Sequence, residues 1–439
     1  MAVDALAGFT QPRGDLGRRQ GLAQLLQDGP AQGRQRGADD VHYSQRTSVR
    51  TKTKQRTVHL HVGRSVHPVY NEQLHAVPEG FTYRFVHPAL ADPTTPTVRI
   101  VTDNDRFRAA RTLAKRGAMR VLSRAGYVRL SRPRIPPGAD LIHSAQFLLH
   151  DPPAPYVVDF EQVGVFSLYQ QIALERPWAR RRLVNAILDD RCRHLLPWSE
   201  TARRGLLKVV GPEHREAVAA RATAVLPAIR PAVGRPHTRG DGPLRVLFVG
   251  TAFYEKGAVE AIRAVKRAGA RLDLVSYVPD AWRRPLEADP DITVHAPGRR
   301  DMIERLYAQS HVLLFPSHMD TFGYVVLEAM AHGLPVAAPG HLALNELVED
   351  GGSGALFAIE NPLYGDDGLA RFPHLLPPPR HYLQALRRPS EAYVDGIAAA
   401  LTRIDEDYDR LAAGALEQVS GSMERRREQL GRIYESAVR

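Results

Sequence analysis

Two acidic side chains, Asp320 and Glu328, lie eight residues apart in the segment from His311 to Glu346. Glu328 is the single charge in a helical run, from Gly323 to His332, that is otherwise almost entirely apolar. A helix that is apolar on all faces is expected to be buried, and a buried carboxylate needs a partner. The ribose hydroxyls of a nucleotide would serve, and so would an internal Arg or Lys. The sequence does not decide between these two kinds of partner for Glu328.

The start of this helical run favours an anion. Phe322 and Gly323 stand at the start of the run, and a small residue there lets free backbone N–H groups and the helix dipole approach a negative charge. At the other end, Gly333 fits a left-handed cap, and Pro335 cannot continue the helix but can begin a strand. The segment is therefore predicted as strand, loop, helix and strand, with the first strand ending at Pro316.

A second candidate element begins with the predicted strand Leu244 to Gly250. It leads through Thr251 to Lys256 and Gly257 and then into a helix. Such an arrangement can cradle a phosphate, although the spacing matches neither the Walker nor the dinucleotide fingerprint. In isolation, Lys256 would be interpreted as a solvated surface lysine.

Taken together, these motifs resemble those of the family 4 glycosyltransferases, which have the GT-B fold. In chain order the matching motifs are Phe248-Val-Gly250, Glu255-Lys-Gly257, Phe315-Pro-Ser317, Phe322-Gly323, Glu328-Ala-Met330, Gly333-Leu-Pro-Val336, Asn345-Glu346 and Glu349-Asp-Gly351. The resemblance covers the C-terminal half well and the N-terminal half only loosely. It implies an α/β protein of two Rossmann-like domains, with a donor and acceptor cleft between them.

The resemblance also implies roles for residues of this chain. Glu328 would hold the ribose, Asp320 the hydroxyls of the donor sugar, and Lys256 the diphosphate. Backbone amides near Gly323 to Val325 would bind the phosphates. The full donor-binding set expected in this way is Glu328, Lys256, Gly250, Thr251, Phe322, Gly323, Tyr324, Val325 and Arg64.

Three positions depart from the family pattern. Thr251 stands where the family often has an arginine, and Asp320 is one methylene shorter than the usual glutamate. Leu342 and Ala343 replace a pair of glycines, so the backbone there approaches a donor less freely. These departures bear on the identity of the donor more than on the fold.

In the N-terminal half, Arg64 follows Gly63 in a loop that the resemblance places near the donor phosphates. It either supplies the charge that Thr251 lacks or is an ordinary loop arginine. Glu161 occupies a place where many relatives have an active-site histidine, so Asp320 and Glu161 are the expected catalytic residues. Asp159 and Glu161 are predicted to point the same way, either toward the cleft or as a pair that caps a turn. His143 is predicted as a core or cleft-wall histidine.

Short β-rich runs that alternate with helical stretches predict parallel sheets with crossover helices. Strands are expected at 58–62, 83–86, 97–101, 141–147, 156–160 and 194–197, and in the second half at 244–250, 272–277, 292–295, 311–316, 335–338 and 355–357. Helices are expected at 106–116 and 177–188. The predicted domains are a disordered basic extension 1–56, an acceptor domain 57–228, a linker 229–242, a donor domain 243–390 with an irregular insert 361–389, and C-terminal helices 391–439 that break near Gly421.

Bulk properties exclude several classes of protein. The 439 residues are 44% hydrophobic and 24% charged, as in ordinary globular proteins. Residues 1–56 carry ten Lys or Arg against five Asp, so nearly half of the net charge of +11 lies in this extension, and no nucleic-acid partner is expected. The single cysteine, Cys192, excludes an intramolecular disulfide and favours a reducing cytoplasm. No long apolar run is present, so any membrane contact, at the inner face, is expected to be peripheral.

We therefore expect a retaining glycosyltransferase that moves a hexose-type sugar from a nucleotide-diphosphate donor to a glycan, lipid or small-molecule acceptor. By resemblance it needs no metal or other cofactor, and the Asp103-Asn-Asp105 triplet is interpreted as a helix-capping turn rather than a metal site. Two rival hypotheses remain: a non-catalytic GT-B scaffold that binds a nucleotide or glycan, and a GT-B sugar-nucleotide 2-epimerase.

Overall fold

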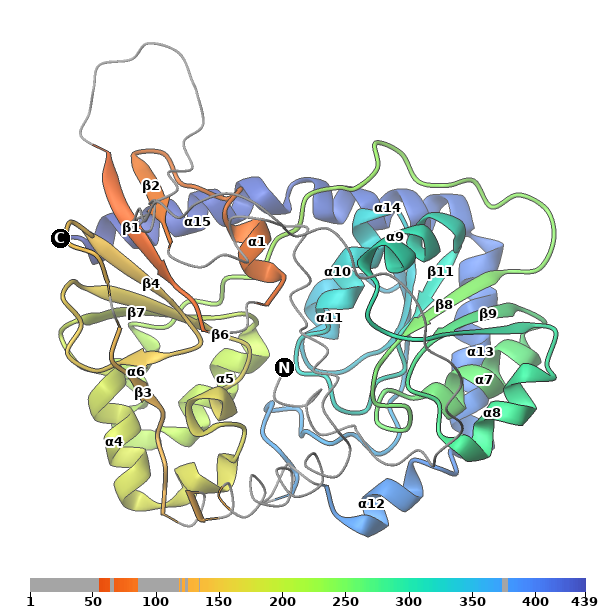
Figure 1. The fold of residues 1–439 in the computed structure, drawn as a ribbon, viewed down its shortest axis with the longest axis horizontal. Coiled ribbons are helices and arrows are strands. Elements are labelled where there is room, and N and C mark those ends of the chain that lie inside the picture. The colour runs from red at the N-terminus through yellow and green to blue at the C-terminus, as the bar shows by residue number, and fades with distance from the viewer. Residues whose placement is uncertain are drawn as a thin grey trace, which may run out of the picture.

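Two parallel β-sheets, each covered by helices, lie side by side in the computed structural model (Figure 1). The structure describes residues 55–63, 67–85, 118, 121–122, 125–133, 135–372 and 378–439. The expected strand 97–101, the expected helix 106–116, the triplet at 103–105 and most of the extension 1–56 lie outside these residues. Arg56, predicted as the end of the extension, is instead the first residue of a strand, and its guanidinium lies 2.7 Å from Glu435.

The first sheet has five strands in the order β2-β1-β4-β6-β7, all parallel. Their bounds are β1 Arg56–His61, β2 Phe81–Arg84, β4 Leu141–Ala145, β6 Tyr156–Phe160 and β7 Cys192–Pro197, and a small second sheet pairs β3 Leu130–Ser131 with β5 Leu148–Leu149. Strands β4 and β6 are buried along their whole length, as expected of parallel strands covered on both faces. The helices of this half are α1 Val69–Gln73, α4 Pro177–Ile187, α5 Glu200–Val209 and α6 Pro212–Ala219, with 3-10 turns at Val163–Ser167 and Gln171–Glu175.

The second large sheet has six parallel strands in the order β10-β9-β8-β11-β12-β13. Their bounds are β8 Arg245–Val249, β9 Arg271–Val275, β10 Ile292–His295, β11 Val312–Leu314, β12 Val336–Pro339 and β13 Gly354–Phe357. The chain runs outward from β8 in one direction and from β11 in the other, so the strand order reverses between them. In open α/β sheets, ligands bind in the crevice at the carboxyl ends of the strands beside such a reversal. The sheet therefore directs attention to the loops that follow β8 and β11.

The helices of the second half are α7 Ala258–Arg267, α8 Asp280–Glu287, α9 Arg300–Gln309, α10 Tyr324–Ala331, α11 Leu344–Leu347, α12 Arg380–Ala385, α13 Glu391–Glu406, α14 Tyr408–Ser420 and α15 Ser422–Ala437. The predicted single break near Gly421 was incomplete, because a further break at Asp407 divides the C-terminal helical region into three helices. Helix α13 packs on α7, whereas α15 returns along the edge of the molecule to the first sheet (Figure 1). In the described part of the chain, no helix has the length and apolar character needed to cross a membrane.

Candidate functional site

Lys256 and Asp320 meet at the carboxyl ends of β8 and β11. Lys256 Nζ donates to Asp320 Oδ2 at 2.6 Å, and the two side chains are only 16% and 22% exposed. The stem of Lys256 lies on Gly250, where a Cβ would come within 2.7 Å of the lysine Cβ, so this turn requires glycine. The interpretation of Lys256 as a solvated surface lysine is therefore wrong. Thr251 follows in the same turn and is half-buried.

Gly257 brings the two loops into contact. It has a φ of +81° at the start of α7, and a Cβ there would lie 2.3 Å from the carbonyl oxygen of Pro316. A side chain would collide with the backbone at the end of the predicted strand that contains β11. Glycine at this position thus explains how the turn after β8 packs against the loop that carries Asp320.

A buried histidine, which the sequence analysis did not single out, anchors the loop of Asp320. His318 Nδ1 lies 2.7 Å from the carbonyl oxygen of Glu360, and Nε2 lies 2.8 Å from Oε1 of Glu260 on α7. His318 and Glu260 are 2% and 0% exposed. The amide of Leu363 also donates to the carbonyl of His318. Glu260 could have been found from the sequence, because it is the lone acidic residue among the apolar residues in the first turn of α7.

Helix α10 begins and ends as predicted. Its N-cap, Gly323, has a φ of +83°, no side chain caps its first turn, and Gly333 just beyond its end has a φ of +72°. The helix is buried except for a half-buried stripe formed by Tyr324, Val325 and Glu328. Glu328 therefore lies on the partly accessible side of α10, together with the two residues that begin the helix.

Glu328 already has partners within the chain. Arg300 Nη1 donates to Oε1 at 3.0 Å, and the hydroxyl of Tyr307 lies 3.4 Å from Oε2. The internal-arginine interpretation thus holds, but the Arg300 side chain is 62% exposed and that of Glu328 is 16% exposed. Burial raises the pKa of Glu328, and the charge of Arg300 opposes that rise. Because Arg300 lies so near the solvent, it can release one oxygen of the Glu328 carboxylate to the hydroxyls of a polyol, or it can share that oxygen with them.

Glu161 approaches this group from the first half of the molecule. It directly follows β6, and its Oε1 accepts a hydrogen bond of 2.5 Å from the hydroxyl of Tyr169, a residue that the sequence analysis missed. Burial raises the pKa of Glu161, the charge of Asp320 raises it further, and Lys256 opposes the rise. Glu161, Asp320 and Lys256 therefore lie close enough to influence one another's charge across the boundary between the halves.

Asp159 is buried inside the first half, whereas its shared direction with Glu161 stays a prediction. It is 1% exposed, and its Oδ1 accepts from the hydroxyl of Tyr70 at 2.7 Å. His143 Nε2 lies 3.4 Å from the other oxygen, Oδ2, without hydrogen-bond geometry, while its Nδ1 lies 2.5 Å from the hydroxyl of Tyr434. His143 is thus a core histidine, as predicted.

Phe322 and Tyr324 form part of the contact between the two halves. The ring of Phe322 packs edge-on against Trp198, and the ring of Tyr324 packs against His67, with centroid distances of 5.5 and 5.3 Å. The side chain of Phe322 is buried at 3% exposure. The side chain of Phe322 therefore serves the interface, and only its backbone can serve a donor.

Further contacts join the halves around the site. The carboxylate of Glu346 accepts from the backbone amides of Glu200 and Thr201 at the start of α5, at 2.9 and 3.1 Å. The insert 361–389 contacts the first half as well. The side-chain amide of Gln162 donates a hydrogen bond of 3.1 Å to the hydroxyl of Tyr364. These contacts join residues more than 140 positions apart, so sequence spacing carried no signal for them.

Arg64 lies outside the described residues, so its predicted role stays a prediction. Cys192, also named from the sequence, does not contribute to this geometry. Cys192 is buried, and burial raises the pKa of its thiol to about 12, so it has no nucleophilic character.

Comparison with known proteins adds two findings, of which the first concerns sequence. Residues 243–364 match the family model of the glycosyl transferases group 1. The D-inositol 3-phosphate glycosyltransferase of Mycolicibacterium gilvum is 39% identical over 71 residues, which are 16% of this chain and 16% of that protein. The corresponding protein of Xylanimonas cellulosilytica is 31% identical over 153 residues, or 32% of this chain and 36% of its own. The chain thus spans little more than a third, at most, of these two curated relatives.

The second finding concerns the fold. Sucrose-phosphate synthase from Thermosynechococcus elongatus superposes with a TM-score of 0.50 at 16% identity, over 87% of this chain and 98% of that one. HepE from Anabaena, in complex with UDP and glucose, superposes with a TM-score of 0.52 at 14% identity, over 87% and 100% of the two chains. The chain therefore has the GT-B fold, in which two Rossmann-like halves face each other.

Proposed function

We propose that this protein is a retaining, metal-independent glycosyltransferase that moves a hexose-type sugar from a nucleotide-diphosphate donor to a glycan, lipid or small-molecule acceptor. The observation that carries the proposal is the Lys256–Asp320 ion pair at the carboxyl ends of β8 and β11, beside the half-buried Glu328 and the start of α10. The match of residues 243–364 to the glycosyl transferases group 1 supports the class of reaction, and the complex of HepE with UDP and glucose supports the class of donor.

In the proposed complex, the donor binds mainly to the second half. The diphosphate binds to Lys256 and to the first-turn amides of α10, since both present positive charge to an anion. Loss of its lysine partner frees Asp320 to accept hydroxyls of the donor sugar. The ribose hydroxyls bind Glu328, in place of Arg300 or beside it.

The acceptor then enters from the first half, near Glu161. In a same-face reaction, the bond between the anomeric carbon and the phosphate oxygen breaks, and the bond between that carbon and the acceptor oxygen forms on the same side. The departing phosphate accepts the proton of the acceptor hydroxyl, and Lys256 and the α10 amides stabilise its charge. Glu161 orients the acceptor hydroxyl.

A panel of sugar nucleotides tests this function. The protein is incubated with each donor, with and without candidate acceptors, and the release of nucleoside diphosphate is measured. Transfer predicts release that depends on an acceptor and product with retained anomeric configuration. Tight binding without turnover would instead indicate a scaffold, and conversion of the donor without an acceptor would indicate an epimerase.

A further inference from the structure

Helix α4 presents an exposed basic and aromatic face that has no part in the site above. Its inner face packs on the core through Ala179, Leu183, Val184 and Ile187. Trp178 is 54% exposed, although its indole N–H donates to the carbonyl of Ala125 at 3.1 Å, and Arg181 and Arg182 are exposed beside it. An exposed aromatic ring next to adjacent arginines is the combination found where proteins contact the interface of a membrane.

The arginines of this face also lack acidic partners. Across the described ranges, no carboxylate lies within ion-pair distance of Arg181, Arg182 or Arg191. The exposed arginines of α9 behave differently, because Arg300 pairs with Glu304 and Arg305 pairs with Asp301. Positive charge on α4 is thus left for an external anion.

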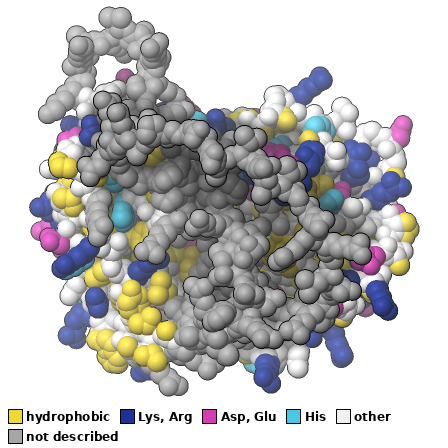
Figure 2. Space-filling model, in the orientation of Figure 1, with side chains coloured by type: hydrophobic (Ala, Val, Ile, Leu, Met, Phe, Trp, Pro, Cys, Tyr) yellow, Lys and Arg dark blue, Asp and Glu magenta, His cyan; other side chains and the backbone are white. Residues whose placement is uncertain are grey.

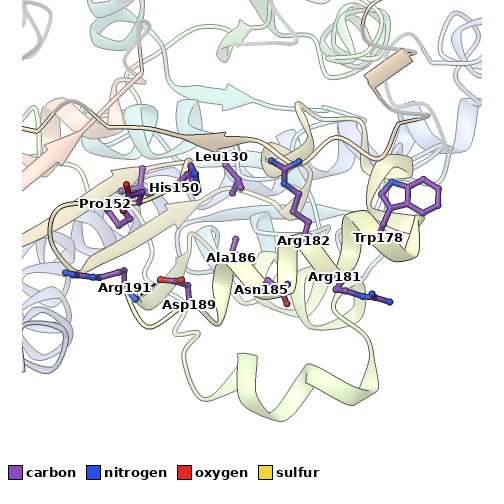
Figure 3. Close-up of a pocket in the computed structure, with 12 residues that line it drawn as sticks. Leu130, His150, Pro152, Trp178, Arg181, Arg182, Asn185, Ala186, Asp189 and Arg191 are labelled. Carbon is purple, nitrogen blue, oxygen red and sulfur yellow. Dashed lines mark hydrogen bonds between the residues drawn. The ribbon is translucent and has the colours of Figure 1, made fainter.

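A cavity of about 490 Å³ opens between α4 and the small sheet of β3 and β5. Leu130, Leu149 and Ala186 give it apolar walls. Arg182 rises from α4 toward the strand of Leu130, whereas Trp178 lies at the far end of the cavity (Figure 3). Arg191, Asp151 and Asp189 line it too, so the cavity combines apolar walls with both cationic and acidic groups.

The face of the molecule that carries α4 also exposes apolar side chains. Hydrophobic side chains gather in the region of α4 and β3, at the lower left of the molecule, and Lys and Arg side chains lie beside them (Figure 2). Apolar area rimmed by unpaired cations complements a membrane whose surface carries phosphate groups. The Trp side chain suits the interfacial depth of such a membrane.

We propose that the α4 face docks on an anionic membrane surface. Trp178 inserts at the level of the headgroups, and Arg181 and Arg182 bind lipid phosphates. The cavity accepts one headgroup, and Asp151 in its lining can accept a headgroup hydroxyl such as that of phosphatidylglycerol.

The place of α4 relative to the cleft gives this docking a consequence, which rests on the proposed function. Gln171, six residues before α4, accepts a hydrogen bond of 2.9 Å from the amide of Ala370 in the second half. The segment that leads into α4 therefore lies at the boundary between the halves. A lipid-borne acceptor would reach the cleft from this side.

The chain offers a matched control on α8. Both helices carry a Trp closely followed by adjacent arginines, but Trp282 packs on Phe253 with a centroid distance of 5.7 Å and Arg283 pairs with Asp280. Arg181→Glu/Arg182→Glu and Arg283→Glu/Arg284→Glu change the net charge equally. Their comparison separates a specific face from the general positive charge, including that of residues 1–56.

Vesicle binding by the full-length protein tests the proposal and needs no sugar donor, so its outcome is independent of that of the transfer assay. We expect binding to phosphatidylcholine vesicles that contain phosphatidylglycerol, and a loss of about tenfold or more for Arg181→Glu/Arg182→Glu but not for the α8 control. Brominated lipids should quench the fluorescence of the wild type more than that of Trp178→Phe. Thermal unfolding confirms that each variant is folded.

Three outcomes would overturn the proposal. The wild type could fail to bind anionic vesicles, or the two charge variants could lose equal affinity. Glycerol phosphate in solution could also bind at the α4 face of the wild type but not of the Arg181→Glu/Arg182→Glu variant, while vesicles do not bind. This result would reveal a site for a small anion instead of a membrane surface.

Discussion

Glu328 connects burial to chemistry at the level of a single residue. Its carboxylate must be ionised to accept two ribose hydroxyls well, and burial raises its pKa. Protonation therefore begins at a higher pH than for an exposed glutamate, and it removes the negative charge that the hydroxyls bind.

We predict that donor affinity falls as the pH is lowered through this raised pKa, starting above the usual range for glutamate of about 4.3. Calorimetric titration of the nucleotide diphosphate at a series of pH values measures the effect. Glu328→Gln should bind weakly and lose this part of the pH dependence. A variant that keeps the full dependence would assign it to another group.

The His318 and Glu260 pair makes a second prediction at this level. Removal of one partner leaves the other buried without its hydrogen bond, which typically costs about 1–3 kcal/mol. We expect His318→Phe to lower the thermal stability strongly and to weaken donor binding through the loop of Asp320. The double variant His318→Phe/Glu260→Leu should recover part of the stability, because no unpaired carboxylate remains.

Recovery of stability without recovery of donor affinity would fit a positioning role for His318. Equal stability of the single and the double variant would contradict the coupling between the two side chains.

The turns that follow β8 and β11 show how much of the local structure the sequence can reveal. Glycines at 323 and 333 and the strand, loop and helix order were predictable, because left-handed positions and apolar runs leave a direct trace in residue type. The partners of Glu328 were not, since Arg300 comes from another helix. Likewise, the burial of Lys256 depends on Asp320, 64 residues away, and no periodicity reports such a contact.

Gly257 provides the test at the level of elements. Gly257→Ala would combine a left-handed φ of +81° with a Cβ only 2.3 Å from Pro316 O. Gly269→Ala is the matched control, because Gly269 has a φ of +63° and nothing within 4 Å of its Cβ position. We expect the control to lose about 1 kcal/mol of stability and Gly257→Ala to lose about 1–3 kcal/mol more.

Thermal unfolding and donor titration together check this prediction. A similar loss of stability in both variants would mean that the contact between the two loops is unimportant.

At the scale of the whole molecule, the last helix unites the two halves. Tyr434 of α15 bonds to His143 and Tyr83 inside the first half, although α14 before it packs against α10 in the second. The helical pattern of 391–439 was visible in the sequence, but its division between two sheets was not. Burial of Tyr434, at 0% exposure, depends on a surface that only the assembled first half supplies.

Glu346 gives a prediction at this scale. Its carboxylate caps α5 from the opposite half, where it meets the positive end of the helix dipole. We expect Glu346→Ala to loosen the two halves and to increase the radius of gyration measured by small-angle X-ray scattering. Glu349 is a nearby exposed glutamate, so Glu349→Ala is the control. Identical scattering curves for the two variants would contradict a role of the Glu346 carboxylate in holding the halves together.

The central claim is that the loops after β8 and β11, together with α10, form the site of a sugar nucleotide. Its most direct test is the affinity of the best donor of the panel for the wild type, for Glu328→Ala and for Glu287→Ala, an exposed control on α8. Loss of two charge-assisted hydrogen bonds of about 1.5–3 kcal/mol each predicts that Glu328→Ala binds at least about 100-fold more weakly, while the control is unchanged. Unaltered donor binding by a folded Glu328→Ala protein would contradict the assignment of this site.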